Sequence, residues 1–181
     1  MGILKIADMG FARVFYNPAK PLADVDTVVV TLWYRAPELL LGSRHYTVAI
    51  DNWAVGCIFV ELMTLEPLFH CRQDDTKSTS PYNYDQLDRI FCILGMPTEK
   101  DWPLLPYMPE YNTLQHEFNP NKYLSCSLQK YLDKFGLGTS MTSSRLIGLF
   151  KSLLIFDPTS RATAYQALNN QFFKEQPLPA T

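Results

Sequence analysis

Apolar residues are most densely placed between positions 48 and 63, where they fall on every side of a helical period. A helix that is apolar all round belongs in the interior of a domain, so this pattern predicts a buried central helix over 48–63. Thr47 precedes it as a candidate N-cap, and Asp51 lies in the first turn, where the helix dipole favours an anion. Pro67 is expected to end the segment.

Four further helices are predicted from apolar spacing and capping residues. Residues 84–94 carry apolar side chains at i, i+3, i+4 and i+7. Asn83 precedes them, and its spacing to Gln86 resembles a capping box. Weaker periodic segments predict three more helices, at 127–134, 143–155 and 163–170.

The remaining segments lack helical periodicity. Residues 3–7 resemble a short strand, which is not stable without a neighbouring strand to pair with. Residues 11–30 and 97–125 are rich in Pro and Asn or poor in periodicity, and we expect them to be mostly loop. No internal repeat or domain boundary is visible. The pattern therefore predicts a single, mainly α domain over residues 1–181.

Composition narrows the class of protein without naming a function. Hydrophobic residues make up 47% and charged residues 19% of the 181 positions, which is typical of a globular domain. The net charge of −2 gives no basic face for nucleic acid, and no apolar run reaches the roughly 18 residues of a membrane span. Four widely spaced cysteines and three histidines show no metal-ligand spacing. We expect a soluble protein with reduced cysteines.

Two short motifs carry the chemical signal. Asp8-Met9-Gly10 stands 25 residues before Ala36-Pro37-Glu38. A carboxylate on a turn can hold Mg²⁺ between nucleotide phosphates, although an isolated Asp-x-Gly is more often an ordinary turn. Protein kinases bracket their activation segment with Asp-Phe-Gly and Ala-Pro-Glu, so the spacing favours a magnesium role for Asp8 and an activation segment over 8–38.

The sequence Val-Val-Thr-Leu-Trp-Tyr-Arg-Ala-Pro-Glu at 29–38 resembles the activation segment of cyclin-dependent protein kinases. The resemblance implies that Val29, Val30 and Arg35 form the pocket for the proline that follows the phosphorylated residue. It also implies that Thr31 contacts the catalytic aspartate and lysine. These four residues are the expected substrate-binding residues.

Two positions depart from the usual pattern of these kinases. Asp26 stands five residues before Thr31, where many of them carry a phosphorylated threonine. A carboxylate supplies a permanent but smaller charge, so we expect no activating phosphorylation there. Met9 replaces the usual Phe beside Gly10, and a flexible methionine is expected to fill the same apolar gap.

The resemblance also assigns structural roles to three distant charges. Glu38 is expected to pair with Arg161, which lies in Asp-Pro-Thr-Ser-Arg at 157–161. From residue types alone, two solvated charges would be the simpler interpretation. Asp51 accepts hydrogen bonds from the catalytic loop in this family. Because the sequence holds no such loop, Asp51 is expected to contact only the helix terminus and water.

Within the family, the likeness is strongest to the Mediator-associated kinases that partner cyclin C. It rests on Asp-Met-Gly-Phe-Ala-Arg at 8–13, Phe-His-Cys-Arg-Gln at 69–73 and Pro-Leu-Pro at 177–179. The resemblance implies a nuclear, ATP- and Mg²⁺-dependent Ser/Thr kinase that regulates transcription. Its substrates would be the RNA polymerase II C-terminal repeat and transcription factors. Its partners would be cyclin C and the Mediator kinase module, with no direct contact to nucleic acid or membrane.

Several kinase parts are missing from the 181 residues. The sequence has no Gly-x-Gly-x-x-Gly loop, no strand lysine paired with a helix glutamate, and no His-Arg-Asp, so no catalytic residue can be named. We therefore expect an incomplete large lobe without the small β-rich lobe, a fragment that neither binds ATP tightly nor transfers phosphate. The apolar helix at 48–63 should then expose a face that needs a partner.

Two other interpretations stay open. The chain could be a short non-catalytic binding module, similar to a pseudokinase, that engages substrate or Mediator surfaces. It could also be an unrelated helical scaffold, although the number of matches in the same order argues against chance.

Overall fold

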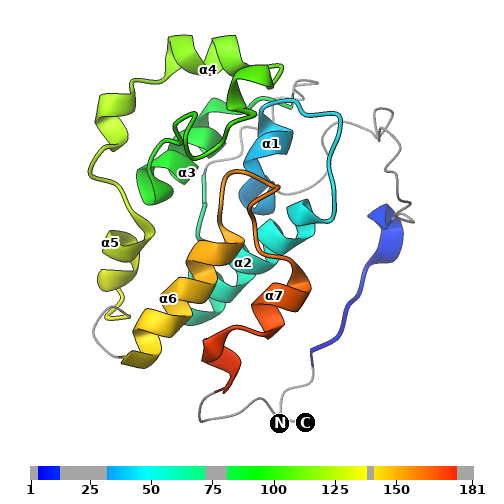
Figure 1. Cartoon of the computed structure of the whole chain (residues 1–181), viewed down its shortest axis with the longest axis vertical. Helices are drawn as coiled ribbons and strands as arrows, with labels where there is room; N and C mark the ends of the chain where they lie inside the picture. The colour runs from blue at the N-terminus through cyan, green and yellow to red at the C-terminus, as the bar shows by residue number, and fades with distance from the viewer. Residues whose placement is uncertain (1–3, 13–31, 72–80, 138–140, 175–181) are drawn as a thin grey trace.

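The computed structural model describes residues 4–12, 32–71, 81–137 and 141–174 (Figure 1). These residues form helices and turns and contain no strand, as expected for a mainly α large lobe. The α-helices of the described ranges are α1 (Pro37–Leu40), α2 (Ala49–Thr64), α3 (Tyr84–Leu94), α4 (Tyr111–Glu117), α5 (Leu128–Asp133), α6 (Met141–Leu153) and α7 (Ala164–Leu168). Short 3-10 turns are η1 (Met9–Phe11), η2 (Leu32–Tyr34), η3 (Leu105–Tyr107), η4 (Pro120–Tyr123) and η5 (Gln171–Lys174).

Helix α2 lies at the centre and packs along α6 (Figure 1). Trp53 is fully buried on α2, and its ring stacks on Phe69 with a centroid distance of 5.6 Å. Gly56 permits the close approach of α6, because a Cβ added there would lie 3.0 Å from side-chain atoms of Leu153 and Leu154. The helix predicted at 48–63 thus occupies Ala49–Thr64.

The start of α2 differs from the predicted cap. The N-cap residue is Val48, and no side chain caps the helix. Thr47 instead precedes the cap, and its Oγ1 accepts a hydrogen bond from the Ala49 amide at 3.2 Å. The helix ends at Thr64, before Pro67 is reached, and its C-cap residue Leu65 has a left-handed φ of 61°.

One side of α2 is exposed, so the prediction of burial on all sides is wrong for the described residues. Val55, Ile58, Leu62 and Met63 are all exposed, Leu62 by 65%. The side that packs against the core carries Trp53, Cys57 and Val60. The apolar residues around α2 therefore form two surfaces: one packs in the core, and the other is exposed to solvent. This open side agrees with the second expectation drawn from the sequence, an apolar face without cover.

Capping residues fix several of the shorter helices. Asn83 Oδ1 accepts from the Gln86 amide at 2.8 Å, but the reciprocal bond of a capping box is absent. The Gln86 side chain bonds instead to the Phe69 carbonyl and the Cys71 thiol. A complete capping box, formed by residues 163 and 166, begins α7, which ends at 168 rather than 170.

The prediction of loop over 97–125 is wrong in part. This segment contains η3, α4 and η4, and it buries Trp102, Leu105, Leu114 and Phe118. These helices are too short to show a repeating apolar pattern, and they are held by packing against the core.

The strand predicted at 3–7 is also wrong for residues 4–7, which have no regular structure. Leu4 and Ile6 are 94% and 84% exposed. No described segment pairs with them, and an isolated strand is not stable. The predicted loop at 11–30 lies almost entirely outside the described residues. None of the described helices has the length and apolar character needed to cross a membrane.

Candidate functional site

A buried ion pair lies at the end of the candidate activation segment. Arg161 Nη1 and Nη2 donate to Glu38 Oε1 and Oε2 at 2.8 and 2.9 Å. The remaining guanidinium hydrogens donate to the carbonyls of Ala49, Ile155 and Phe156 at 2.9, 2.9 and 3.1 Å. All five donors of the guanidinium are therefore used, which is the condition for a tolerable buried charge. The interpretation as two solvated charges does not hold.

Local turns position both partners of this pair. Glu38 stands in the first turn of α1 behind Pro37, a residue suited to the first helical position. On the other side, Asp157 accepts bonds from the Thr159 amide and from the hydroxyls of Thr159 and Ser160. Burial raises the pKa of Asp157, but these hydrogen bonds outweigh it and the pKa lies below its usual value. This turn presents Arg161 toward α1.

Two aromatic residues anchor the segment Leu32–Leu40, which we call the platform segment. The Tyr34 hydroxyl donates to Glu61 Oε2 on α2 at 2.8 Å, and burial together with this carboxylate raises the pKa of Tyr34 to about 12. Trp33 Nε1 donates to the Cys71 carbonyl at 3.0 Å, and its ring meets His70 edge-on at 4.5 Å. Neither contact was predicted from the sequence. The sequence did offer one signal for them: Trp33 and Tyr34 precede Ala-Pro-Glu, and the polar groups of such side chains usually find hydrogen-bond partners when they are buried.

The predicted substrate-binding residues are only partly within the described chain. Val29, Val30, Thr31 and the regulatory Asp26 lie outside the described residues. Arg35 is described. It is half-buried beside Tyr34, and its burial lowers the pKa of the guanidinium from its usual value.

Within the described part of the chain, the predicted metal residue Asp8 belongs to no cluster of three or more potential metal ligands. Asp8 is exposed in a left-handed conformation, with φ 58° and ψ 68°, just before η1. Met9 is 61% exposed, so the packing expected of it is absent among the described residues. A Cβ on Gly10 would lie 3.4 Å from Asp8 Oδ1, an ordinary contact. Asp51 is exposed in the first turn of α2, at the helix end and next to solvent.

Asp8 alone does not complete a magnesium site. Mg²⁺ in nucleotide sites takes one or two carboxylates together with phosphate oxygens and water. In the described ranges, no group of three or more His, Cys, Asp or Glu side chains could hold a metal ion. The described residues therefore contain no preformed cluster of three metal ligands, and Asp8 is the one ligand that the family resemblance names.

A family model described as the protein kinase domain matches residues 1–173. The chain belongs to the protein kinase family. It is 55% identical to cyclin-dependent kinase 8 of Drosophila melanogaster over 178 residues, which cover 98% of this chain and 38% of that protein. It is 49% identical to cyclin-dependent kinase E-1 of Arabidopsis thaliana, over 98% of this kinase chain and 36% of that protein. The chain is 43% identical to serine/threonine-protein kinase SSN3 of Phaeosphaeria nodorum, over 99% of this chain and 44% of that protein.

A solved structure shares the same fold. The kinase chain aligns with a chain of the yeast RNA Pol II CTD kinase CTDK-1 complex with a TM-score of 0.77 and 32% sequence identity. The alignment covers 97% of this chain and 51% of that chain. The chain thus spans less than half the length of the curated relatives named above, and about half of the structural neighbour. Its helices are those of a protein kinase large lobe.

Proposed function

We propose that this chain is the substrate-presenting part of a Ser/Thr protein kinase of the cyclin-dependent, Mediator-associated type. The observation that carries the proposal is the buried ion pair between Glu38 of the platform segment and Arg161. This pair, with the Tyr34 and Trp33 hydrogen bonds, fixes both ends of the short stretch that carries Arg35. A rigid backbone at this position suits the binding of an extended peptide beside a phosphate donor.

The site residues outside the described ranges complete the proposed peptide site. Val29, Val30 and Arg35 would contact the proline after the target Ser or Thr, and Thr31 would face the catalytic residues of the whole kinase. Asp26 would supply the fixed charge that replaces activating phosphorylation. The roles of Val29, Val30, Thr31 and Arg35 rest on the family resemblance at 29–38, and that of Asp26 rests on its position five residues before Thr31.

ATP and Mg²⁺ belong to the proposed activity of the whole kinase. Asp8 would contribute one carboxylate to the metal, whose chemistry is to neutralise the phosphate charge. The sequence given holds no Gly-rich loop, strand lysine or His-Arg-Asp, and the described residues complete no metal site. We propose that the 181-residue chain alone binds ATP weakly at best and is inactive.

Partners and substrates follow from the relatives. The curated relatives include cyclin-dependent kinase 8 and SSN3, and the structural neighbour is named a CTD kinase of RNA Pol II. We propose cyclin C and Mediator kinase-module subunits as partners, the polymerase C-terminal repeat and transcription factors as substrates, and the nucleus as the location. The whole kinase would act in transcription regulation.

A chimera tests the proposal. Residues 1–173 of this chain replace the matching segment of the full-length Drosophila cyclin-dependent kinase 8, and transfer of radiolabelled phosphate to a C-terminal repeat peptide is measured with its cyclin. The chimera should be active, and Arg35→Ala should raise KM for the peptide more than it lowers kcat. A folded chimera without activity would contradict the proposed function.

The second candidate, a non-catalytic binding module, is favoured by one observation. The exposed apolar side of α2, with Ile58 and Leu62 at its centre, is a surface that gains stability when covered. A module of this kind would bind Mediator or substrate proteins without turnover. An inactive chimera together with tight binding of the isolated chain to a purified Mediator kinase module would favour this candidate.

A further inference from the structure

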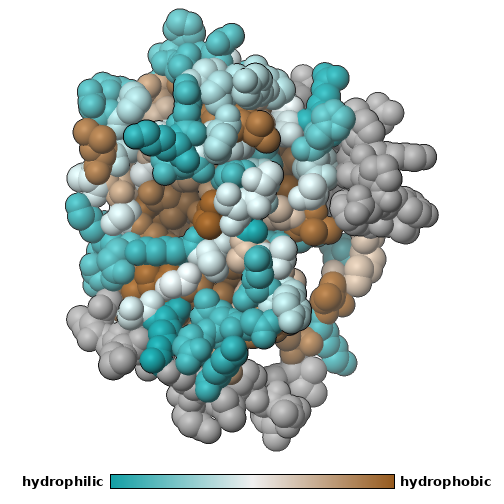
Figure 2. Space-filling view, in the orientation of Figure 1, coloured by the Kyte–Doolittle hydropathy of each residue, from teal (hydrophilic) through white to brown (hydrophobic). Residues whose placement is uncertain are grey.

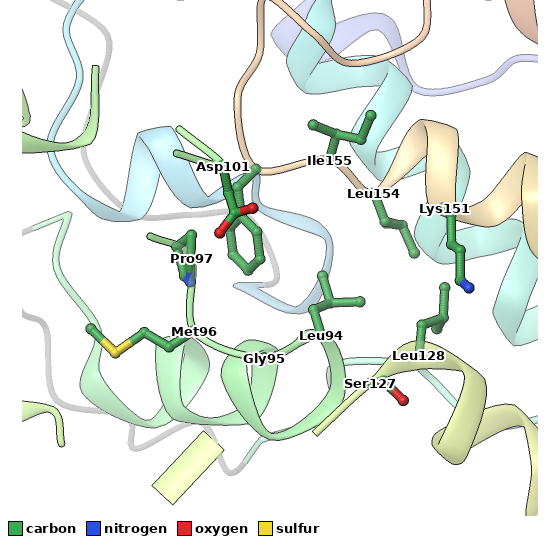
Figure 3. A pocket seen from close by; sticks show the side chains of 11 residues that line it. Leu94, Gly95, Met96, Pro97, Asp101, Ser127, Leu128, Lys151, Leu154 and Ile155 are labelled. Atoms are coloured by element: carbon green, nitrogen blue, oxygen red, sulfur yellow. The ribbon is translucent and has the colours of Figure 1, made fainter. Parts of the chain in front are cut away.

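An apolar hollow lies between α3, α5 and α6, far along the chain from the platform segment. Its walls include Leu94, Leu128, Leu154 and Phe156, and its volume is about 370 Å³. Figure 2 shows apolar surface gathered on this face between the helices, and Figure 3 shows the side chains that line the hollow. This volume falls within the range of natural ligand sites, which starts at about 300 Å³. We call it the α3–α6 hollow.

The walls of the α3–α6 hollow are held in place by internal bonds. The carbonyls of Ile155 and Phe156 both accept hydrogen bonds from Arg161. The Gly95 amide donates to the carbonyl of residue 91 at 2.9 Å, which fixes the turn after α3. Ser127 caps α5 through its hydroxyl oxygen. Because these walls are already ordered, a ligand that binds here would lose little free energy to ordering the protein.

Opposite charges stand at the two sides of this hollow (Figure 3). Asp101 Oδ2 accepts from the amide and hydroxyl of Thr98 at 2.9 and 2.7 Å, which orients the carboxylate and leaves Oδ1 open to a ligand. The Lys151 ammonium, on the last turn of α6, makes no hydrogen bond or ion pair with another described residue. Both side chains are exposed, so the charges orient a ligand while the apolar walls supply most of the affinity.

A second hollow of about 380 Å³ adjoins the first, because both are lined by Met96 and Pro97. Its apolar walls include Leu105 and Phe118, and Glu99 stands among its lining residues. Together the two hollows, which share Met96 and Pro97, form a groove with two apolar sites. Such a groove matches an extended peptide, which places separate side chains in separate pockets.

We propose that this groove is a docking site for a linear peptide segment of a partner protein. The peptide places one apolar side chain in each hollow, a basic residue near Asp101 and Glu99, and an acidic residue at Lys151. Asp101 lines one hollow and Glu99 lines the other, and these carboxylates disfavour nucleic acid and anionic lipid, whose charge is negative. The site is separate from the platform segment, and the proposal stands whether or not the chain takes part in phosphate transfer.

Random linear peptides displayed on phage and selected on the full 181-residue chain test the proposal. The enriched peptides should combine apolar, basic and acidic residues. The most enriched one, labelled with fluorescein, should bind about tenfold more weakly to Lys151→Glu in a polarisation assay. Exchanging the acidic residue of the peptide for lysine should restore its affinity for Lys151→Glu. Asp101→Asn keeps the acceptor for Thr98, and it should weaken binding of the basic residue.

Lys134→Glu, an exposed charge reversal on a residue outside both hollows, is the matched control and should change affinity by no more than about twofold. Peptides that bind equally to Lys151→Glu and Lys134→Glu occupy another face and would overturn the proposal. A selection that enriches no peptide would overturn it as well. So would self-association of the chain that Lys151→Glu abolishes, because the occupant would then be a second copy.

Discussion

Arg161 and Glu38 are 123 positions apart in the sequence, yet their side chains form a two-point ion pair that is almost completely excluded from water. The pair joins the end of the candidate activation segment to the turn after α6. Arg161 also donates to the Ala49 carbonyl at the start of α2. One guanidinium therefore connects three segments that are distant in the chain.

Removing Arg161 should be strongly destabilising. Arg161→Ala leaves the Glu38 carboxylate buried without its partner, so the free energy of unfolding should fall by about 3–5 kcal/mol. Urea denaturation followed by circular dichroism measures the change. Lys174→Ala, an exposed charge on η5, should stay within about 0.5 kcal/mol of the parent. If both variants lost the same free energy of unfolding, the ion pair would not stabilise the fold and the prediction would be wrong.

Tyr34 should contribute to stability up to alkaline pH. Burial and Glu61 raise the pKa of Tyr34 from 10.0 to about 12 in the folded chain. Because the folded pKa is the higher one, this contribution is complete below about pH 10 and is lost as pH rises through about 12. Tyr34→Phe should therefore show a shallower loss of unfolding free energy over that interval. The exposed substitution Tyr165→Phe is the control, and an identical alkaline slope for parent and Tyr34→Phe would contradict the prediction.

Gly56 and Gly148 give a matched pair of helix substitutions. A methyl group at Gly56 would lie 3.0 Å from atoms of Leu153 and Leu154, so Gly56→Ala should destabilise by about 1–3 kcal/mol. Gly148 on α6 has no atom within 4 Å of an added Cβ, so Gly148→Ala should stabilise by about 0.5–1 kcal/mol. Thermal unfolding should give a lower melting temperature than the parent for Gly56→Ala and a higher one for Gly148→Ala. A stabilising Gly56→Ala would mean that α2 and α6 do not pack as described.

The open side of α2 should bind a hydrophobic dye. Replacing Ile58 and Leu62 together by lysine should reduce the fluorescence of bound anilinonaphthalene sulfonate while far-ultraviolet circular dichroism stays unchanged. Leu124→Lys removes an apolar side chain that is even more exposed, in a different part of the chain, and should leave the dye signal nearly intact. Equal effects of the two changes would remove the argument for a continuous apolar face.

Helix periodicity and motif order were readable from the sequence because both are local. The helix predicted at 48–63 lies at 49–64, and that at 84–94 has the same bounds in the structure. The pairing of Glu38 with Arg161 was accessible only through the family resemblance. Residue types alone do not separate a buried pair from two solvated charges.

The errors arose where distant contacts decide local structure. Helix α4 has only seven residues, and its Leu114 and the following Phe118 are held by the core rather than by intrinsic preference. Gln86 was predicted to cap α3 but instead bonds to the chain before it, at Phe69. The hydrogen bond of Tyr34 to Glu61 depends on how the platform segment crosses α2, which no short-range pattern encodes.

The central claim is that this chain holds a kinase substrate platform without the parts that transfer phosphate. Incubation of the purified 181-residue chain with radiolabelled ATP, magnesium and a C-terminal repeat peptide tests it directly, with the full-length Drosophila kinase and its cyclin as positive control. We predict no label in the peptide above background. Transfer that is present in the parent chain and abolished by Asp8→Asn would come from the chain itself and would contradict the account.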